Sequence, residues 1–255
     1  MTPSPPPTDP ASAPLALPGV VHLLRPSGPA VEDLAGLRAA VAAASPASLF
    51  HHVHHPLLRH AYGGVPAPDD YSAWVGGVLQ DRETAERLSY AAQAHGAGPD
   101  ELRDALLAAL PAAGAAGAGA HADAAFAPLE MDRVDVDLGL AAHDADELVE
   151  LLCGSGAALF FHHVIERPWF DPHGATVAGW AEARGAAELG QWLRDVPRSG
   201  RTLEDSRRRL LQRWRRSRVL HAITGGADEP EGVRQARARR AVTGLVERLH
   251  GGADR

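Results

Sequence analysis

The sequence predicts an all-α protein, formed by tandem duplication of one helical unit whose two copies pack about a pseudo-two-fold axis. Much of the hydrophobic content of 45% is alanine, and aromatic residues make up only 5%. Alanine loses no side-chain entropy in a helix, so this composition favours helices. No convincing pair of alternating strands is found. A repeated Phe-His-His-Val motif predicts the duplication.

The order of compositional breaks divides the chain of 255 residues into five parts. We expect residues 1–18 to form a disordered tail, because seven prolines leave few groups that can pack. Residues 19–110 form the first helical repeat. Residues 111–125 form a flexible linker, because alternating glycine and alanine specify little structure. Residues 126–224 form the second repeat, and residues 225–255 a C-terminal helix and tail.

The two repeats align in order along the chain. Phe50–Val53 matches Phe161–Val164 at an offset of 111 residues, with four identities in a row. Further along, Trp74 matches Trp180 as loops shorten. An ordered series of matches with a slowly changing offset is typical of a tandem duplication.

Local patterns indicate where individual helices lie. Leu34, Leu37 and Val41 recur at helical spacing in the first repeat. Asp81 and Asp100 are expected N-caps, because a carboxylate accepts hydrogen bonds from the first unpaired N–H groups of a helix.

Several short motifs in each half resemble an uncharacterised prokaryotic family known as domain of unknown function 5752. In the first half they are Ser48-Leu49-Phe50-His51-His52, Asp69-Asp70-Tyr71-Ser72-Ala73-Trp74, Thr84-Ala85-Glu86-Arg87-Leu88 and Glu101-Leu102-Arg103. In the second half they are Leu159-Phe160-Phe161-His162-His163 with Glu166, then Trp180, then Thr202-Leu203-Glu204-Asp205-Ser206-Arg207.

The resemblance covers most of residues 33–220 and departs from the family pattern at two places. His55 stands where the pattern has an acid, and Thr176-Val177 stands where Asp-aromatic is expected. The family has no assigned activity, so the resemblance implies an architecture and carries no catalytic residues.

Histidines are the sharpest chemical feature, since the chain has 14 of them. On a helix, His52 and His55 share a face, as do His163 and Glu166. If the repeats pack about a two-fold axis, these four side chains converge on one possible metal site. Imidazoles and a carboxylate suit a divalent zinc, iron or manganese ion. The alternative, which we favour, is a buried helix face on which each histidine bonds a carbonyl or carboxylate.

Charge is distributed unevenly along the chain. Residues 1–200 carry 11 arginines and 25 acidic residues, whereas residues 201–255 carry 14 arginines and 7 acidic residues. A basic patch at Arg208, Arg215 and Arg216 could bind nucleic acid or an acidic partner. The chain has no lysine, which indicates a codon bias that inflates arginine, and it has no nucleic-acid-binding motif. We therefore do not expect nucleic acid as a partner.

The prediction for function is a non-enzymatic module that binds a small ligand or a protein in the groove between the repeats. The candidate groove residues are His52, Trp74, His163 and Trp180. One alternative is a metal-dependent enzyme at the histidine site, and the other is an arginine-helix binder of nucleic acid or an acidic partner. A single cysteine, no signal peptide and no long apolar run predict a cytoplasmic protein without a membrane span.

Overall fold

A computed structural model describes residues 13–63, 68–93, 98–112 and 124–224, with side chains described as far as residue 220. The chain separates into two compact units, residues 1–207 and 208–255. Most of the predicted tail, most of the predicted linker and all of the predicted C-terminal part lie outside the described residues.

Unit 1 contains both strands and helices. Its strands are β1 (Leu15–Ala16), β2 (Gly19–Pro26), β3 (Leu129–Val136) and β4 (Ala141–Ala142). The helices before residue 112 are α1 (Leu34–Ala43), α2 (Pro46–Val53), α3 (His55–Arg59), α4 (Asp70–Gly77), α5 (Arg82–Ala92) and α6 (Pro99–Ala109). The later ones are α7 (Ala145–Gly154), α8 (Ala157–Phe161), η3 (His162–Glu166), α9 (Arg167–Phe170), α10 (Val177–Ala183), α11 (Ala187–Asp195) and η4 (Val196–Arg198).

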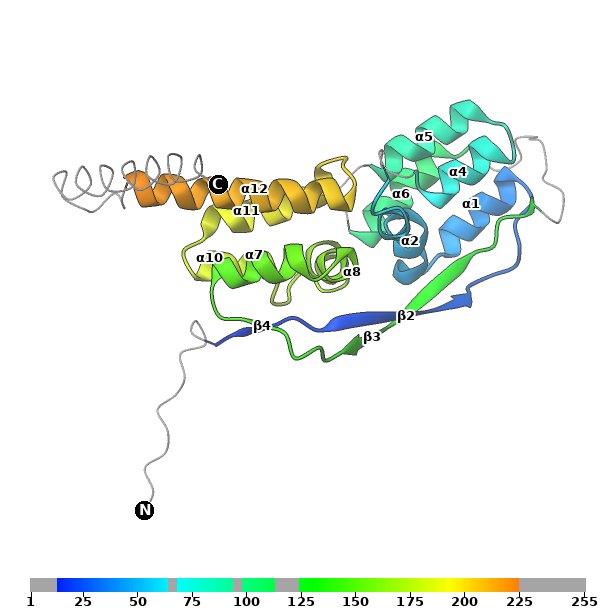
Figure 1. The fold of residues 1–255 in the computed structure, drawn as a ribbon. Coiled ribbons are helices and arrows are strands. Elements are labelled where there is room, and N and C mark those ends of the chain that lie inside the picture. The colour runs from blue at the N-terminus through cyan, green and yellow to red at the C-terminus, as the bar shows by residue number, and fades with distance from the viewer. Residues whose placement is uncertain (1–12, 64–67, 94–97, 113–123, 225–255) are drawn as a thin grey trace, which may run out of the picture. The chain divides into compact units, whose positions relative to one another are not determined.

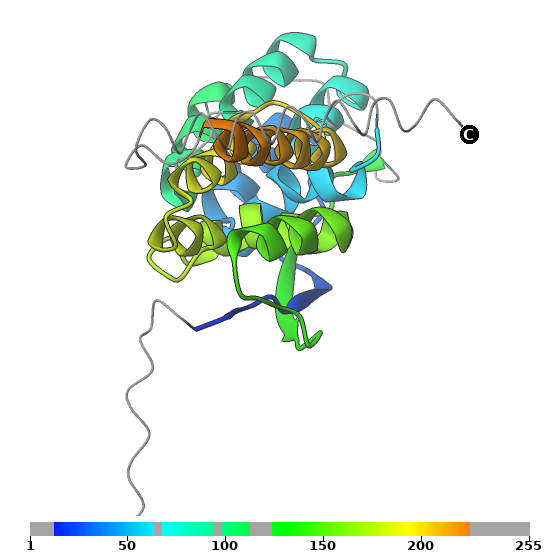
Figure 2. The same ribbon diagram turned by 60° about the vertical axis from the view of Figure 1, so that its left-hand side comes forward.

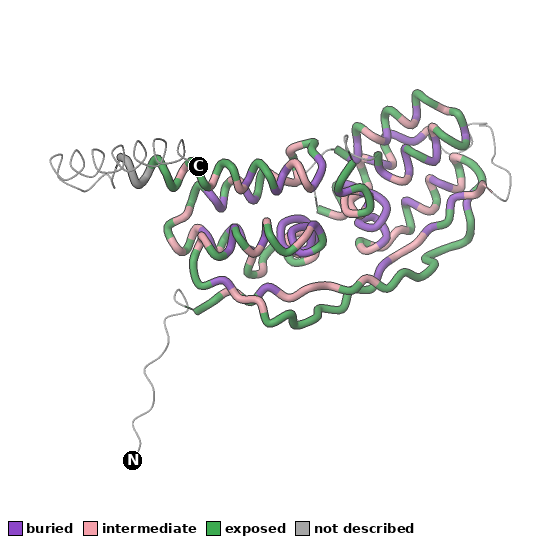
Figure 3. The backbone as a smooth tube through the Cα atoms, viewed as in Figure 1, coloured by how far each residue is buried: buried purple, intermediate pink, exposed green. Residues whose placement is uncertain are grey.

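The all-α prediction is wrong, because the structure contains two antiparallel two-stranded sheets. β2 pairs with β3 over eight residues, and β1 pairs with β4. In Figure 1, α1, α2 and α4–α6 gather over one end of the β2–β3 ribbon, and α7, α8, α10 and α11 over the other. Figure 2 shows the helices on the same side of the paired strands. The outer side of the ribbon is largely exposed, whereas the inward sides of the helices are buried (Figure 3).

Two features hid these strands in the sequence. β2 reads Gly-Val-Val-His-Leu-Leu-Arg-Pro, without the alternation that marks a half-buried strand. Its partner β3 lies more than a hundred residues later, so no hairpin turn links the two.

The ladder geometry determines which backbone groups point out of the ribbon. Ser27 continues the register and donates its N–H to the carbonyl of Pro128 at 2.9 Å. Pairs alternate between bonded and non-bonded positions in an antiparallel ladder, so the next pair, Pro26 and Leu129, is a non-bonded one. The N–H of Leu129 therefore points away from β2, toward the helices.

Four helices of the first helical segment, α1–α6, begin at a side-chain cap. Asp33, Ser45, Asp69 and Asp81 each accept a backbone N–H at a helix start. Asp81 is thus confirmed as a cap, whereas Asp100 lies in the first turn of α6, whose N-cap is Gly98. The helices enclose one apolar cluster, which includes Leu37, Leu49, Trp74, Leu88, Leu106 and Phe126.

The second helical segment, α7–η4, contains a π-helical turn at η3. The N–H of Arg167 bonds the carbonyl of His162, five residues back. Pro168 follows and has no N–H for the regular bond to Val164, while its ring crowds that carbonyl, which accounts for the widened turn. Every residue of η3 is buried, and π-turns inside helices often mark functional sites.

Residues after 207 belong to the second compact unit. The helix α12 spans Leu203–Thr224 and so reaches into it. Arg208, Arg215 and Arg216, the predicted basic patch, are all exposed on this helix. Over the part of the chain that the structure describes, no helix has both the length and the hydrophobicity needed to cross a membrane.

Candidate functional site

His52 on α2 is a buried histidine with both ring nitrogens bonded. Its Nε2 accepts the N–H of Leu129 at 2.9 Å, so its Nδ1 carries the proton, which it donates to Oδ2 of Asp70 at 2.9 Å. Arg59 donates to both oxygens of the same carboxylate, at 2.6 and 2.8 Å. Burial alone would raise the pKa of Asp70, but the hydrogen bond from His52 and the charge of Arg59 lower it below its usual value.

His163 on η3 occupies the matching position in the second segment and bonds the other strand in the opposite sense. Its Nε2 donates to the carbonyl of Pro18 at 2.9 Å, because a proline has no N–H to offer. Burial, followed by the nearby His162, lowers the pKa of His163 to about 4. His52 thus holds the first residue of β3, and His163 holds the residue that precedes β2.

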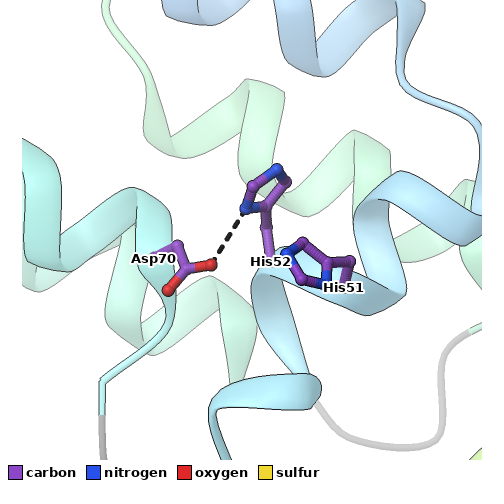
Figure 4. Close-up of side chains that lie close together, drawn as sticks. All are labelled: His51, His52 and Asp70. Atoms are coloured by element: carbon purple, nitrogen blue, oxygen red, sulfur yellow. Dashed lines mark hydrogen bonds and ion pairs between the residues drawn. The ribbon is translucent and has the colours of Figure 1, made fainter. Parts of the chain in front are cut away.

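The four predicted metal ligands do not come together as one group. Among the described residues, one group of three or more histidine, cysteine or acidic side chains has its ligand atoms within 4.8 Å of one another. This group is His51, His52 and Asp70 (Figure 4). A histidine that binds a metal normally donates its other ring N–H to an acceptor. His52 does the reverse, since its Nε2 accepts from Leu129. A metal at Nδ1 would then require an imidazolate or the loss of that bond, so this trio is better suited to a structural network.

His51 is buried and His55 half-buried, and their imidazoles make little polar contact. Nδ1 of His51 and both ring nitrogens of His55 have no hydrogen-bond partner among the described residues. The rings instead pack on one another, with 5.2 Å between centroids, and His55 meets His22 edge-on at 5.1 Å. Burial is the main cause that lowers the pKa of each to about 4, so both are neutral at pH 7.

Glu166 is fully buried and is held by two histidines. Its Oε2 accepts from Nδ1 of His162 at 2.8 Å, and its Oε1 accepts from Nε2 of His22 at 2.8 Å. Burial would raise the pKa of Glu166, but these hydrogen bonds outweigh it and lower the pKa to about 2. The carboxylate is therefore ionised, and it lies 4.0 Å from the Nε of Arg133.

In front of His162 lies a cleft of about 310 Å³, here called the His162 cleft. Its lining residues are Arg133, Asp135, His162, Arg167, Phe170 and Asp171. Nε2 of His162 has no hydrogen-bond partner among the residues described, although the side chain is only 1% exposed. The guanidinium of Arg133 stacks 3.7 Å from the centre of the Phe170 ring. The side chain of Arg167 makes no hydrogen bond or ion pair with any described residue.

The predicted groove tryptophans lie elsewhere. Trp74 is buried in the first core and donates its Nε1 to the carbonyl of Ala124 at 2.8 Å. Trp180 packs under the guanidinium of Arg184, 3.8 Å from the ring centre. A separate cleft of about 260 Å³ does lie between the two helical segments, lined by both, and none of the four groove candidates lines it.

The residues around the His162 cleft were missed by sequence reasoning, although one signal was available. The motif Phe-His-His-Val contains two histidines, and the prediction used the second of each pair with an i, i+3 partner. The bonded pair is instead His162 with Glu166, four residues apart. Arg133 and His22 come from β3 and β2, which the sequence did not reveal as strands.

Comparison with known proteins agrees with this architecture. Residues 13–215 match a family described as a family of unknown function, DUF5752. The chain belongs to this family. No curated protein matches the sequence. The DUF5752 chain is similar in fold to OrfY from Thermoproteus tenax, with a TM-score of 0.65 and 21% identity over 80% of this chain and 96% of that one.

Proposed function

We propose that the protein binds a small anionic ligand in the His162 cleft. The observation that carries the proposal is the Nε2 of His162, buried and without a described partner at the cleft wall. A buried polar atom without a hydrogen bond costs free energy, and a ligand hydroxyl, or a water held by the ligand, that donates a hydrogen bond to this nitrogen would recover it.

The charges in the cleft favour an anion. Arg133 and Arg167 present guanidinium groups, which match carboxylate and phosphate oxygens in paired hydrogen bonds. Stacking on Phe170 holds Arg133 in place. Asp135 and Asp171 also line the cleft, and both are exposed to solvent. Their charge is therefore screened more than that of the half-buried Arg167.

Calorimetric titration with inorganic phosphate and with acetate tests this proposal. Phosphate should bind and raise the melting temperature, whereas chloride at the same ionic strength should not. Arg167→Gln should weaken phosphate binding by about tenfold or more, since a hydrogen bond to a charged group is lost. Arg82→Gln is the matched control, because Arg82 is 92% exposed and, among the residues that the structure describes, pairs only with Glu86. Equal binding by wild type and Arg167→Gln, or no binding by either, would contradict the proposal.

We also infer that the chain arose by tandem duplication, with repeats at residues 19–110 and 126–224. His22 and Arg133 face each other in the ribbon and are 111 residues apart, the offset between the two Phe-His-His-Val motifs. A two-fold axis through this pair would relate the two halves.

Two further sets of contacts support the same offset. Adding 111 to Leu15 and subtracting it from Ala142 turns their pairing into that of Phe126 with Val31, which is also present. The same shift turns the contact of His52 with Leu129 into that of His163 with Pro18. Each half therefore binds the strand that precedes the other.

The metal site predicted at His52, His55, His163 and Glu166 stays a prediction, as does a cytoplasmic location. Elemental analysis of protein purified without chelator tests the metal. Stoichiometric zinc, iron or manganese that disappears in His163→Ala would support it, and metal-free protein would leave the histidines with structural and ligand-binding roles.

A further inference from the structure

The imidazole of His162 is fixed in one orientation from behind. Glu166 accepts from its Nδ1, while His22 occupies the other oxygen of that carboxylate. Because an ionised carboxylate only accepts hydrogen bonds, the ring proton lies on Nδ1 and the lone pair on Nε2. Enzymes orient general bases in this way, with a buried carboxylate that sets the tautomer.

The nitrogen that carries the lone pair faces a carboxylate of the cleft. Nε2 of His162 is 3.7 Å from Oδ1 of Asp135. That separation is too long for a good hydrogen bond, and a small outward rotation of the Asp135 side chain makes room for a water that donates one proton to each atom. Asp135 is 53% exposed, so solvent reaches this position. A water bound in this way would direct its oxygen lone pairs into the cleft.

We propose that the ligand of the His162 cleft is a phosphomonoester and that His162 is the general base of its hydrolysis. This inference rests on the anion site proposed above. The two guanidiniums of Arg133 and Arg167 match the two negative charges of a phosphomonoester. Of the small anions that guanidinium groups bind, a phosphoryl group offers an electrophilic atom that the water could attack.

The step balances without any further reactant. Nε2 of His162 takes a proton from the water as the water oxygen forms a bond to phosphorus. The ester P–O bond breaks on the side opposite the water, and its electron pair leaves with the alcohol oxygen, which takes a proton from solvent while the imidazolium releases its proton to solvent. The products are inorganic phosphate and an alcohol. Arg133 and Arg167 stabilise the charge on the phosphoryl oxygens during transfer.

Phosphate release from a panel of phosphomonoesters that includes p-nitrophenyl phosphate tests the proposal, with chelator present to remove trace metals. His162→Gln should lower kcat by about a hundredfold or more, the range for loss of a general base, while inorganic phosphate still binds within a few-fold. Asp135→Asn, at an exposed strand position, should also lower kcat and is expected to fold. His143→Gln is the control, since His143 is 68% exposed, pairs with Glu147 and does not line the cleft.

Glu166 is a positioning residue in this scheme. Glu166→Gln should lower kcat with little change in KM, and it should shift the acid limb of the pH profile, which a purely structural role would not move. Wild-type protein that binds phosphate but hydrolyses none of the esters faster than His162→Gln and Asp135→Asn would overturn the inference and leave the anion site standing. Wild-type protein that binds no phosphate would overturn both.

Discussion

The two Phe-His-His-Val segments have the same four residues but different chemical surroundings. In the first, His51 has an unpaired Nδ1 and packs on His55, both of whose ring nitrogens are unpaired among the described residues. In the second, the matching His162 bonds the buried carboxylate of Glu166. Residues 55 and 166 occupy equivalent positions at the offset of 111. A single difference, His55 against Glu166, therefore separates a pair of neutral imidazoles from an imidazole that a carboxylate holds in one orientation.

The second histidine of each motif, His52 or His163, bonds the backbone, and the direction of that hydrogen bond differs between the two. His52 accepts from the N–H of Leu129, whereas His163 donates to the carbonyl of Pro18, its equivalent position. A proline at one of the two positions removes the donor and so reverses the direction of the bond. The repeated local motif constrains where the rings lie, while their partners decide which nitrogen carries the proton.

The largest expected effect comes from the carboxylate. Glu166→Ala would leave Nδ1 of His162 and Nε2 of His22 buried without a partner. We expect a loss of about 3–5 kcal/mol in the free energy of unfolding, measured by urea denaturation, as for other broken buried pairs. Glu86→Ala, at a surface ion pair, is the control and should change stability far less. Equal effects of the two substitutions would mean that the buried pair contributes nothing.

Acid should destabilise the protein through the unpaired histidines. The pKa values of His51 and His55 are lowered to about 4 in the folded state, below the value of 6.5 for an unfolded histidine. The unfolded chain therefore binds more protons between these values, so stability is full above pH 6.5 and is lost as the pH falls toward 4. We expect about 2–4 kcal/mol to be lost between pH 7 and pH 5.

Thermal unfolding across this range measures the acid effect. His51→Gln combined with His55→Leu should flatten the dependence, and His163, with its own pKa of about 4, should account for part of what remains. An unchanged slope in the double variant would show that these two histidines are not its source.

A proline at position 129 would match the proline at position 18, so that neither His52 nor His163 would face a backbone N–H there. Leu129→Pro removes the N–H that His52 accepts without removing a ladder bond, because that N–H points away from β2. Leu129→Ala keeps the N–H and loses only the side chain. We expect the proline variant to be less stable than the alanine variant by about 1–2 kcal/mol in urea denaturation. The reverse order would mean that the bond to His52 adds no stability.

The smallest effect should have the opposite sign. His55→Leu removes two buried ring nitrogens that have no described partner while keeping a side chain of similar bulk. At pH 7 we expect a change between zero and about 1 kcal/mol of added stability, by the same denaturation assay. A clear loss of stability instead would point to a bound water or ion at His55.

Much of the helical architecture could be predicted from the sequence. Apolar spacing placed Leu37 and Val41 on the buried side of α1, and the cap at Asp81 was correct. The motifs also indicated membership of the DUF5752 family, which the match over residues 13–215 bears out. These features depend on residues a few positions apart, for which helical geometry alone determines which side chains share a face.

The ribbon and the His162 cleft were decided by the tertiary structure. β2 and β3 lie 110 residues apart, and their pairing brings His22 and Arg133 to the buried Glu166. No local pattern encodes such a meeting, because it depends on how two distant segments cross. The sequence determined that His162 and Glu166 share a helix face. Only packing gave them a second histidine, His22, and the strand arginine Arg133, because burial and long-range strand pairing act on the whole chain at once.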